Sequence, residues 1–242
     1  MGFWGSIAIF CRGFLLYSNP VKVGKRAFCL KVAALGEIPI YTFSDFFHFL
    51  EIFVLRTYDM NLQKAPKRIL DIGANVGMYS LRCIKLYPES QILAFEPVAS
   101  NFQRLRENMA GKGKRGCLRN QGVSNKSGSA EIHLHPVNSG AHSLFALSDA
   151  KGAQKETIQL VNINDIVTEI NAPIDVMKLD CEGAEEAIIM GLSKQNAARI
   201  GAMVIEPMFG LYARETFLER LSELGFEHHF QNGLLVATKK HP

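Results

Sequence analysis

Residues 68–81 have the sequence RILDIGANVGMYSL. The apolar run that starts at Arg68 and ends at Asp71 predicts a buried strand, and Gly73 and Gly77 predict a tight turn that opens a helix. A glycine turn lets the backbone approach a ligand closely, and the free N–H groups at a helix N-terminus favour an anionic group. The stretch therefore predicts the first strand, turn and helix of an α/β unit that holds a ligand at the turn.

A second apolar strand is predicted within residues 92–97, whose sequence is ILAFEP, and it ends in Glu96. In a βαβ unit, an acid at this position accepts hydrogen bonds from ribose hydroxyls. A dinucleotide needs the spacing G-x-G-x-x-G, but Asn75 stands where the middle glycine should be. Asn75 can hydrogen-bond an amino-acid tail, and Asp71 can meet its ammonium directly or through water. A ribose and an amino acid together describe S-adenosyl-L-methionine; a turn that serves packing alone is the less favoured alternative.

The composition predicts a globular protein that is not built from membrane spans. The chain has 242 residues, of which 48% are hydrophobic and 21% charged, and no apolar run reaches the ~20 residues that a spanning helix needs. Much of the formal charge of +4 comes from residues 104–126. That stretch has no aromatic residue, so a solvated loop is favoured over a nucleic-acid surface. The five cysteines are scattered without a C-x-x-C pair, which indicates reduced thiols, a cytoplasmic protein and no structural zinc.

Residues 1–62 carry no cofactor signal and are predicted to form a mainly helical extension, followed by a catalytic domain at residues 63–242. Residues 3–17 are very apolar but contain Arg12, and they lack the basic leader and the cleavage site of a secretory signal. We favour a helix that packs on the core. The alternative is an interfacial helix, which would give residues 1–17 a weak association with a membrane surface.

A helix is predicted at residues 45–55, with Ser44 as its N-cap. Apolar side chains recur along this helix at helical spacing, at Phe46, Phe49, Leu50 and Phe53. We expect this stripe to pack against the catalytic domain. The alternative is that it roofs a substrate pocket.

From Arg68 onward, strand and helix patterns alternate along the chain. Helices are predicted at residues 76–86, 99–109, 165–170, 184–192 and 214–224. Further strands are predicted at residues 91–95, 117–122, 130–135, 157–161, 174–179, 202–205, 227–231 and 234–238. The pair at 130–135 and 157–161 is expected to be antiparallel, and Asn232-Gly233 joins the last two strands in a hairpin. This α/β pattern predicts a Rossmann-like class I methyltransferase fold, whose mostly parallel seven-stranded sheet ends in an antiparallel hairpin.

A second group of polar residues lies in the stretch IDVMKLDCEGAEEAIIMG, residues 174–191. Ligands of open α/β sheets bind outside the carboxyl ends of the strands, so Asp180 and Glu182 are expected at the rim, near the methyl donor. Glu206 closes the following strand at an equivalent position. Lys178 is predicted either to pair with a carboxylate or to take part in catalysis.

Three of these motifs occur in an order that resembles the FkbM family of methyltransferases: DIGANVG at residues 71–77, AFEP at 94–97 and IDVMKLDCEGAE at 174–185. The resemblance covers residues 66–208, and Asn164 stands where the family usually has an aspartate. It implies transfer of a methyl group from S-adenosylmethionine to a hydroxyl oxygen. The acceptor would be a sugar, a polyketide or another small metabolite.

The motifs and the resemblance together assign roles to the residues of the expected site. The residues expected to bind the cofactor are Asp71, Gly73, Ala74, Asn75, Gly77, Glu96, Pro97, Val98, Gly122, Val123, Ser124 and Asp180. Residues 73–75 are assigned to the methionine tail and Glu96 to the ribose. Pro97 and Val98 are assigned to one side of the adenine, and residues 122–124 to its far edge.

A neutral alcohol is a poor nucleophile, so a general base is expected to take its proton as the new bond forms. The candidate catalytic residues are Asp180, Glu182 and, from the loop at residues 138–152, His142. Asp180, Glu182 and Glu206 can also be read as metal ligands, but a reaction without a metal is favoured because no Asp-Asp or Asp-Asn pair is present.

Two rival functions stay open beside methyl transfer to a small hydroxylated acceptor. The first is a nucleic-acid methyltransferase, which is disfavoured because the sequence lacks an Asn/Asp-Pro-Pro-aromatic motif and a Pro-Cys nucleophile. The second is a binding module that keeps the cofactor fold without catalysis. A lipid acceptor is the expectation if residues 1–17 lie in a membrane interface.

Overall fold

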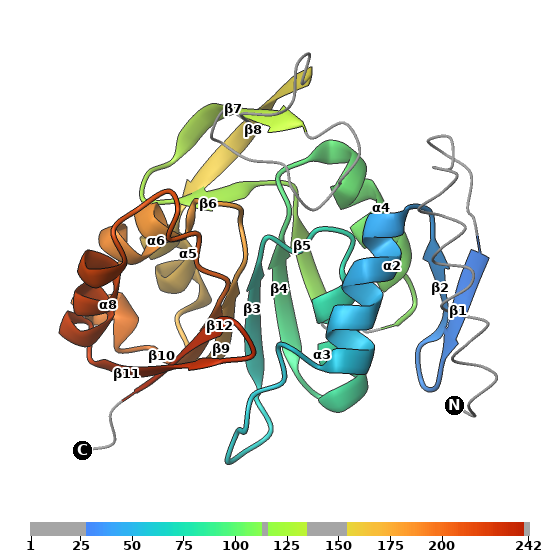
Figure 1. The fold of residues 1–242 in the computed structure, drawn as a ribbon, viewed down its shortest axis with the longest axis horizontal. Coiled ribbons are helices and arrows are strands. Elements are labelled where there is room, and N and C mark those ends of the chain that lie inside the picture. Colours follow the sequence, from blue (N-terminus) through green and yellow to red (C-terminus); the bar gives the residue numbers. More distant parts are fainter. Residues whose placement is uncertain (1–27, 113–115, 135–153, 240–242) are drawn as a thin grey trace.

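The sheet at the centre of the fold has seven strands. In the computed structural model, which describes residues 28–112, 116–134 and 154–239, their order is β11-β12-β10-β9-β3-β4-β5 (Figure 1). The strand bounds, in this order, are Phe226–Gln231, Leu234–Lys239, Ile200–Ile205, Ile174–Leu179, Arg68–Ile72, Gln91–Phe95 and Gly116–Arg119. Neighbouring strands are parallel except that β12 is antiparallel to both β10 and β11. This order confirms the predicted methyltransferase fold and its C-terminal hairpin.

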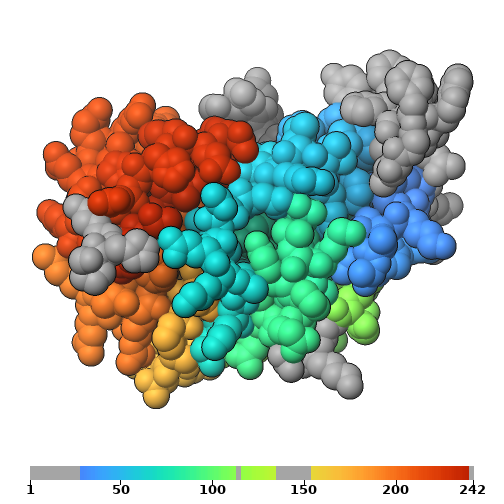
Figure 2. Space-filling model, turned by 90° about the horizontal axis from the view of Figure 1, so that it is seen from below, coloured from blue at the N-terminus to red at the C-terminus, as the bar shows by residue number. Residues whose placement is uncertain are grey.

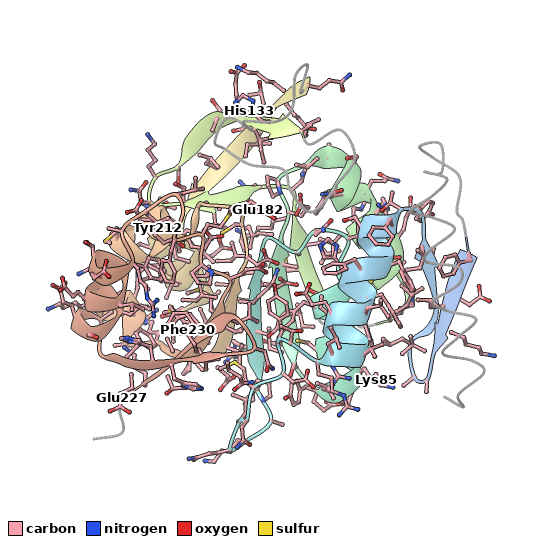
Figure 3. All side chains as sticks on the ribbon, viewed as in Figure 1. Lys85, His133, Glu182, Tyr212, Glu227 and Phe230 are labelled. Atoms are coloured by element: carbon pink, nitrogen blue, oxygen red, sulfur yellow. The ribbon has the colours of Figure 1, made fainter. Side chains whose placement is uncertain are left out.

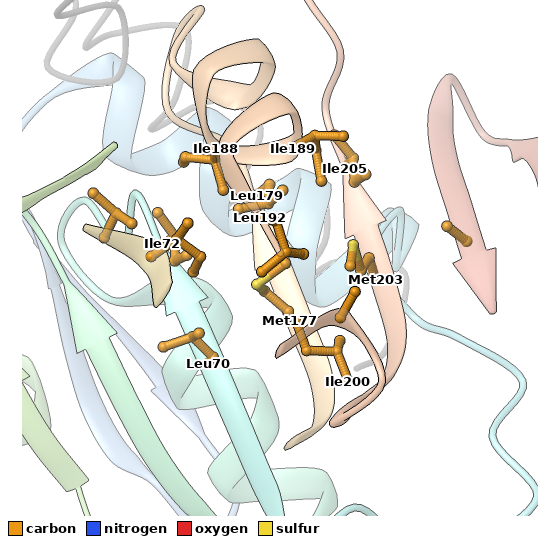
Figure 4. Close-up of a cluster of buried hydrophobic side chains, with 14 of the residues drawn as sticks. Leu70, Ile72, Met177, Leu179, Ile188, Ile189, Leu192, Ile200, Met203 and Ile205 are labelled. Atoms are coloured by element: carbon orange, nitrogen blue, oxygen red, sulfur yellow. The ribbon is translucent and has the colours of Figure 1, made fainter. Parts of the chain in front are cut away.

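Helices cover both faces of this sheet because its strands are apolar on both sides. Leu70 and Met177 belong to the core that packs under α5, α6, α7 and α8 (Figure 4). Their chain neighbours Ile69 and Val176 point to the opposite face and pack with α3 and α4. The helix bounds are Met78–Leu86 for α3, Ala99–Met109 for α4, Ile163–Ile170 for α5, Glu185–Gly191 for α6, Lys194–Ala197 for α7 and Arg214–Glu223 for α8.

The prediction of a mainly helical segment before the main sheet is wrong for residues 28–40, which form a β-hairpin. Its strands are β1 (Phe28–Val32) and β2 (Gly36–Ile40), and alternate side chains are buried at Leu30, Val32, Ile38 and Ile40. In Figure 2 the blue hairpin meets the green surface of α3 and α4. Lys85 and Lys112 of that surface donate to hairpin carbonyl groups. A domain boundary near residue 62 stays a prediction.

A short helix follows the hairpin and continues into a π-helix. The helix α2 spans Phe43–Phe49, and η1 spans Leu50–Leu55. The N-cap of α2 is Thr42 rather than the predicted Ser44. Thr42 Oγ1 accepts a hydrogen bond from Asp45 N–H at 3.1 Å, and Asp45 Oδ2 accepts one from Thr42 N–H at 2.9 Å. This reciprocal capping box fixes where the helix begins. None of the helices within the described ranges is long and apolar enough to cross a membrane.

A smaller sheet of three strands lies above the carboxyl ends of β3 and β4 in Figure 1. Its strand β8 (Gln154–Asn162) pairs antiparallel with β7 (Gly128–Leu134), as predicted, and parallel with β6 (Gly122–Ser124). The single strand predicted at residues 117–122 is divided between β5 of the main sheet and β6 of the smaller one. The predicted loop at 138–152, with His142, lies outside the described residues.

Candidate active site

A cavity of about 500 Å³ opens at the carboxyl ends of β3, β4 and β9. Its walls come from the turn after β3, from the ends of β4, β9 and β10, from the smaller sheet, and from α2 with η1. Glu182 marks this end of the sheet in Figure 3. The strand order reverses direction between β3 and β9, and this is the edge where open α/β sheets bind their ligands.

The glycine turn after β3 lies directly against the end of β9. Gly73 has a φ of +76°, and the N–H groups of Gly73 and Ala74 donate to the Phe95 carbonyl at 3.1 and 2.9 Å. A Cβ at Gly73 would lie 1.7 Å from the Asp180 carbonyl oxygen. Glycine is therefore required by the close approach of two backbone segments, and not only by the space that a ligand occupies.

Glu96 lies buried at the end of β4, with both carboxylate oxygens held by backbone N–H groups. Oε2 accepts from Asn75 at 2.8 Å, and Oε1 accepts from Val98 at 2.9 Å. Burial raises the pKa of Glu96 to about 7, and these two hydrogen bonds oppose the rise. The carboxylate is thus oriented at the cavity wall before any ligand arrives.

Three residues that the sequence assigned to the cofactor do not line the cavity. Asp71 is fully buried, with Ser80 Oγ donating to it at 2.6 Å and Lys178 Nζ 3.6 Å away, so it is covered from a ligand's ammonium. At Gly77, a Cβ would lie 2.7 Å from a leucine side chain of α4, so this glycine serves helix packing. Ser124 is buried in the smaller sheet.

The other residues assigned to the cofactor do line the cavity: Gly73, Ala74, Asn75, Glu96, Pro97, Val98, Gly122, Val123 and Asp180. Val98 also joins Ile132, Ile158 and Leu160 in an apolar cluster, and all four line the cavity. This wall suits the face of a flat ring. The sequence analysis missed the three residues from the smaller sheet, because only the pairing of β7 and β8 brings them to the end of β4.

Asp180 belongs to a hydrogen-bonded group at the opposite side of the glycine turn. Lys178 Nζ lies 3.0 Å from Asp180 Oδ2, and it donates to the Gly73 carbonyl at 2.7 Å. The Tyr58 hydroxyl lies 3.1 Å from Asp180 Oδ2 and 2.5 Å from Glu206 Oε2. Burial opposes the charge on Lys178, but Asp180 and Asp71 together raise its pKa above the ordinary value. Lys178 therefore pairs with carboxylates, which was one of the two predicted roles.

Two further acids of the cavity hold their protons more tightly than free glutamate does. Burial, followed by the charges of Asp180 and Glu206, raises the pKa of Glu182 to about 8. Burial and the same two carboxylates, Glu206 first, raise the pKa of Glu51 to about 7. The carboxylates at this end of the cavity are therefore close enough to repel one another.

One face of α2 and η1 lines the cavity, with side chains at helical spacing: Phe43, Ser44, Phe47, His48, Glu51 and Ile52. The predicted stripe faces the other way, because Phe46 and Phe49 are buried in the core and Phe53 stacks on Phe49. The stripe packs on the core, as expected, and the opposite face of α2 and η1 forms the cavity wall. The sequence analysis missed His48 and Glu51, whose only signal is this spacing along the first helix. It also missed Tyr58, which follows η1 and has no such signal.

The part of the chain that the structure describes contains no group of three His, Cys, Asp or Glu side chains placed to hold a metal ion. Asp180, Glu182 and Glu206 accordingly do not form such a group there. His142 is not among the described residues, so its predicted part in catalysis stays a prediction.

Comparison with known proteins places the chain among methyltransferases. The "Methyltransferase FkbM domain" matches residues 71–231. "Methyltransferase sdnD" of Sordaria araneosa is 27% identical over 212 residues, which cover 75% of this chain and 82% of that protein. "31-O-demethyl-FK506 methyltransferase FkbM" of Streptomyces tacrolimicus is 26% identical over 191 residues, with coverages of 66% and 73%.

Two further similarities are more limited. "2-O-methyltransferase NoeI" of Sinorhizobium fredii is 30% identical over 146 residues, which cover 54% of this chain and 59% of that protein. A crystal structure of methyltransferase FkbM from Methylobacillus flagellatus superposes with a TM-score of 0.49 and 16% identity, over 80% of this chain and 50% of the other. The matched domain covers more than half of the sequence, so the chain belongs to the FkbM family of methyltransferases.

Proposed function

We propose that this chain is an S-adenosylmethionine-dependent O-methyltransferase that acts on a hydroxyl group of a small molecule. The observation that carries the proposal is the single cavity that joins the oriented Glu96 carboxylate to the polar group around Asp180. A family of methyltransferases supplies the reaction type. The residues that line the cavity support the acceptor class and the cofactor.

The cavity residues fit S-adenosylmethionine at three points. Glu96 has acceptor capacity for the ribose hydroxyls, as its two backbone hydrogen bonds leave further lone pairs. Asn75 lines the cavity beside Glu96, and its side-chain amide can hydrogen-bond the amino-acid tail. The apolar cluster around Val98 suits the adenine. When bound, S-adenosylmethionine supplies a methyl group on a sulfonium sulfur.

The wall formed by α2 and η1 supports an acceptor with an apolar body. Phe43 and Phe47 line the cavity and are also exposed at 39% and 53%. Among the described residues, the charged side chains that line the cavity are several carboxylates and one lysine, Lys178, a balance that repels polyanions such as nucleic acids. The relatives named 31-O-demethyl-FK506 methyltransferase and 2-O-methyltransferase support oxygen as the methylated atom.

The chain's own residues would position the acceptor and accept its proton. Holding the hydroxyl oxygen close and aligned accounts for a large part of the rate gain in such reactions. Asp180 and Glu182 line the cavity, as the sequence analysis expected of a base. Asp180 is, however, already hydrogen-bonded to Lys178 and Tyr58.

The proposal is tested with the purified chain, S-adenosylmethionine and a panel of hydroxylated acceptors: a monosaccharide, a flavonoid glycoside, a macrolide polyketide and a short RNA. Mass spectrometry should detect a methyl ether on one of the small molecules, with stoichiometric S-adenosylhomocysteine. Calorimetry should detect cofactor binding. Cofactor binding without product on any acceptor would favour the non-catalytic module, and the absence of binding would overturn the proposal.

We propose a cytoplasmic setting, which is supported by the scattering of the five cysteines along the sequence without a C-x-x-C pair. Association of residues 1–17 with a membrane surface is the alternative that the sequence leaves open. The intact chain should not float with liposomes of neutral and anionic lipids. Strong flotation that disappears when residues 1–17 are deleted would show an interfacial anchor, and the acceptor panel would then include lipids.

A further inference from the structure

His48 stands out among the cavity residues because the proposed mechanism has given it no role. It comes from α2, on the acceptor side of the cavity, and it is the only histidine among the cavity residues in the described part of the chain. A neutral imidazole is the side chain that enzymes use most often to take a proton at neutral pH.

Two polar groups face one nitrogen of this ring. The Asn75 side-chain amide lies 3.4 Å from His48 Nδ1, and Ser44 Oγ lies 3.5 Å from the same atom. A hydroxyl can accept a proton from Nδ1–H, and a half-turn of the amide presents its oxygen to Nδ1. In the placement that the structure gives, the amide nitrogen of Asn75 faces Nδ1 and its oxygen is buried without a partner, and the half-turn exchanges these two positions. With Nδ1 protonated, the lone pair of the ring lies on Nε2.

We propose that His48 is the general base of the methyl transfer, with Nε2 taking the proton of the acceptor hydroxyl. The inference rests on the proposed function. In the step, the O–H bond breaks as the N–H bond forms on Nε2. The freed oxygen pair forms the new O–C bond to the methyl group, and the pair of the former S–C bond stays on the donor sulfur. Asn75 and Ser44 act as positioning residues that fix the ring.

The surrounding charges suit a base that is neutral at rest. Burial lowers the pKa of His48 below its ordinary value, and Lys178 and Arg104 act in the same direction. Asp180 and Asp45 raise it, so they stabilise the imidazolium once the proton arrives. The ring is therefore neutral near pH 7. Asp180 stabilises the charged ring after proton transfer, and it can do so while it stays paired with Lys178.

The carboxylates of the cavity are less suited to this step. Asp180 and Glu206 already accept hydrogen bonds, from Lys178 and Tyr58 respectively. The pKa of Glu182 is raised to about 8, so this carboxyl group is mostly protonated at pH 7 and cannot take a further proton from the acceptor.

Asn75 also connects the base to the cofactor position. Its backbone N–H donates to Glu96 at 2.8 Å, and its side chain reaches His48. A ligand that contacts Glu96 and Asn75 should therefore change the surroundings of the His48 ring. This gives the proposal a readout that does not depend on turnover.

The first experiment measures kinetics. His48→Ala and His48→Gln should lower turnover by ~10²–10⁴-fold, and cofactor affinity should change by less than ~3-fold. Added imidazole should restore part of the activity of His48→Ala. The control is His229→Ala, which removes an exposed histidine on β11 and should behave as wild type. Near-normal turnover in His48→Gln, with a native circular dichroism spectrum, would overturn the proposal.

The second experiment records long-range ¹H–¹⁵N spectra of the histidine rings. The His48 ring should be neutral at pH 7 with its proton on Nδ1, and S-adenosylhomocysteine should shift its signals. Asn75→Gly keeps the positive φ of this position but removes the amide, so the shift should shrink. A proton on Nε2 in an enzyme that still transfers methyl groups rejects the base and leaves the function standing. Absence of both cofactor binding and transfer rejects the function itself.

Discussion

At the scale of single residues, Glu96 gives the most direct test of cofactor binding. Asn75 and Val98 hold its oxygens in place, so the carboxylate is oriented before ribose hydroxyls donate to it. Glu96→Ala should weaken the binding of S-adenosylmethionine by ~1.5–3 kcal/mol, because hydrogen bonds to a charged group are lost. Calorimetric titration measures the change, and Glu219→Gln, an exposed change on α8, is the control. Unchanged affinity in Glu96→Ala would remove this residue from the site.

Gly73 can be compared with a glycine that has the same backbone conformation and different surroundings. Gly73 and Gly36 both have a φ of +76°, but only at Gly73 does a Cβ meet another atom, the Asp180 carbonyl. Gly36→Ala should cost only the ~1–2 kcal/mol of a left-handed alanine. Gly73→Ala should lower the free energy of unfolding, measured in urea, by clearly more than Gly36→Ala does. The reason is that the backbone at Gly73 or at Asp180 must move to make room for the Cβ. Equal losses in the two variants would contradict the close packing of the turn on β9.

The site residues that could be predicted from sequence are those that end a strand in a contiguous motif. Gly73, Glu96 and Asp180 each follow an apolar run directly, so their place at the sheet edge follows from the strand that precedes them. His48 and Tyr58 have no such signal, since their partners lie far along the chain. Asp71 belongs to the same motif as Gly73, but it precedes the end of β3, where the side chain turns into the protein.

At the scale of elements, α2 has two separate roles. One face packs into the core and the other lines the cavity, so its position affects both stability and the acceptor. Thr42→Ala removes the side-chain acceptor of the capping box and should lower the free energy of unfolding by ~0.5–2 kcal/mol. Thr42→Ser keeps a capping hydroxyl and should remain close to wild type. A loss that is the same in both variants would mean that the threonine methyl group, and not the cap, stabilises the helix.

The hairpin of β1 and β2 shows why short strands are harder to predict than the main sheet. Only two buried positions alternate in each strand, at Leu30 and Val32 and at Ile38 and Ile40. Two positions give little periodic signal, whereas β9 has an apolar run followed by a polar motif. Two of the three strands of the smaller sheet, β7 and β8, were predicted. The division of residues 117–122 between two sheets was not predicted, because pairing partners decide it.

At the scale of the whole molecule, residues 28–62, the described part of the segment before the main sheet, pack against the elements of that sheet. Their side chains share one apolar cluster with β3 and β9, and Asp45 forms an ion pair with Arg104 of α4. The acceptor wall, the cofactor turn and the rim carboxylates therefore meet around one cavity although they come from distant parts of the sequence. The cavity also brings together several acids, among them Asp180, Glu182 and Glu206.

Burial of these acids should make the cofactor-free protein less stable as the pH rises. Glu182 has an ordinary pKa of 4.5 that is raised to about 8 in the folded chain. The contribution of Glu182 to the free energy of unfolding is fully present below its pKa in the unfolded chain, because the carboxyl is then protonated in both states. This contribution is lost as the pH rises through the pKa of Glu182 in the folded chain. The window of this loss is therefore pH 4.5 to about 8.

Glu182→Gln removes the charge that causes this loss. Its melting temperature should equal that of wild type at pH 4 and exceed it at pH 9, where each ~1 kcal/mol corresponds to ~2–4 °C for a domain of this size. Glu219→Gln is exposed on α8 and should follow wild type at both values. Differential scanning fluorimetry across this range measures the difference. A melting temperature of Glu182→Gln that tracks wild type at pH 9 would mean that the Glu182 carboxylate is solvated rather than crowded by Asp180 and Glu206.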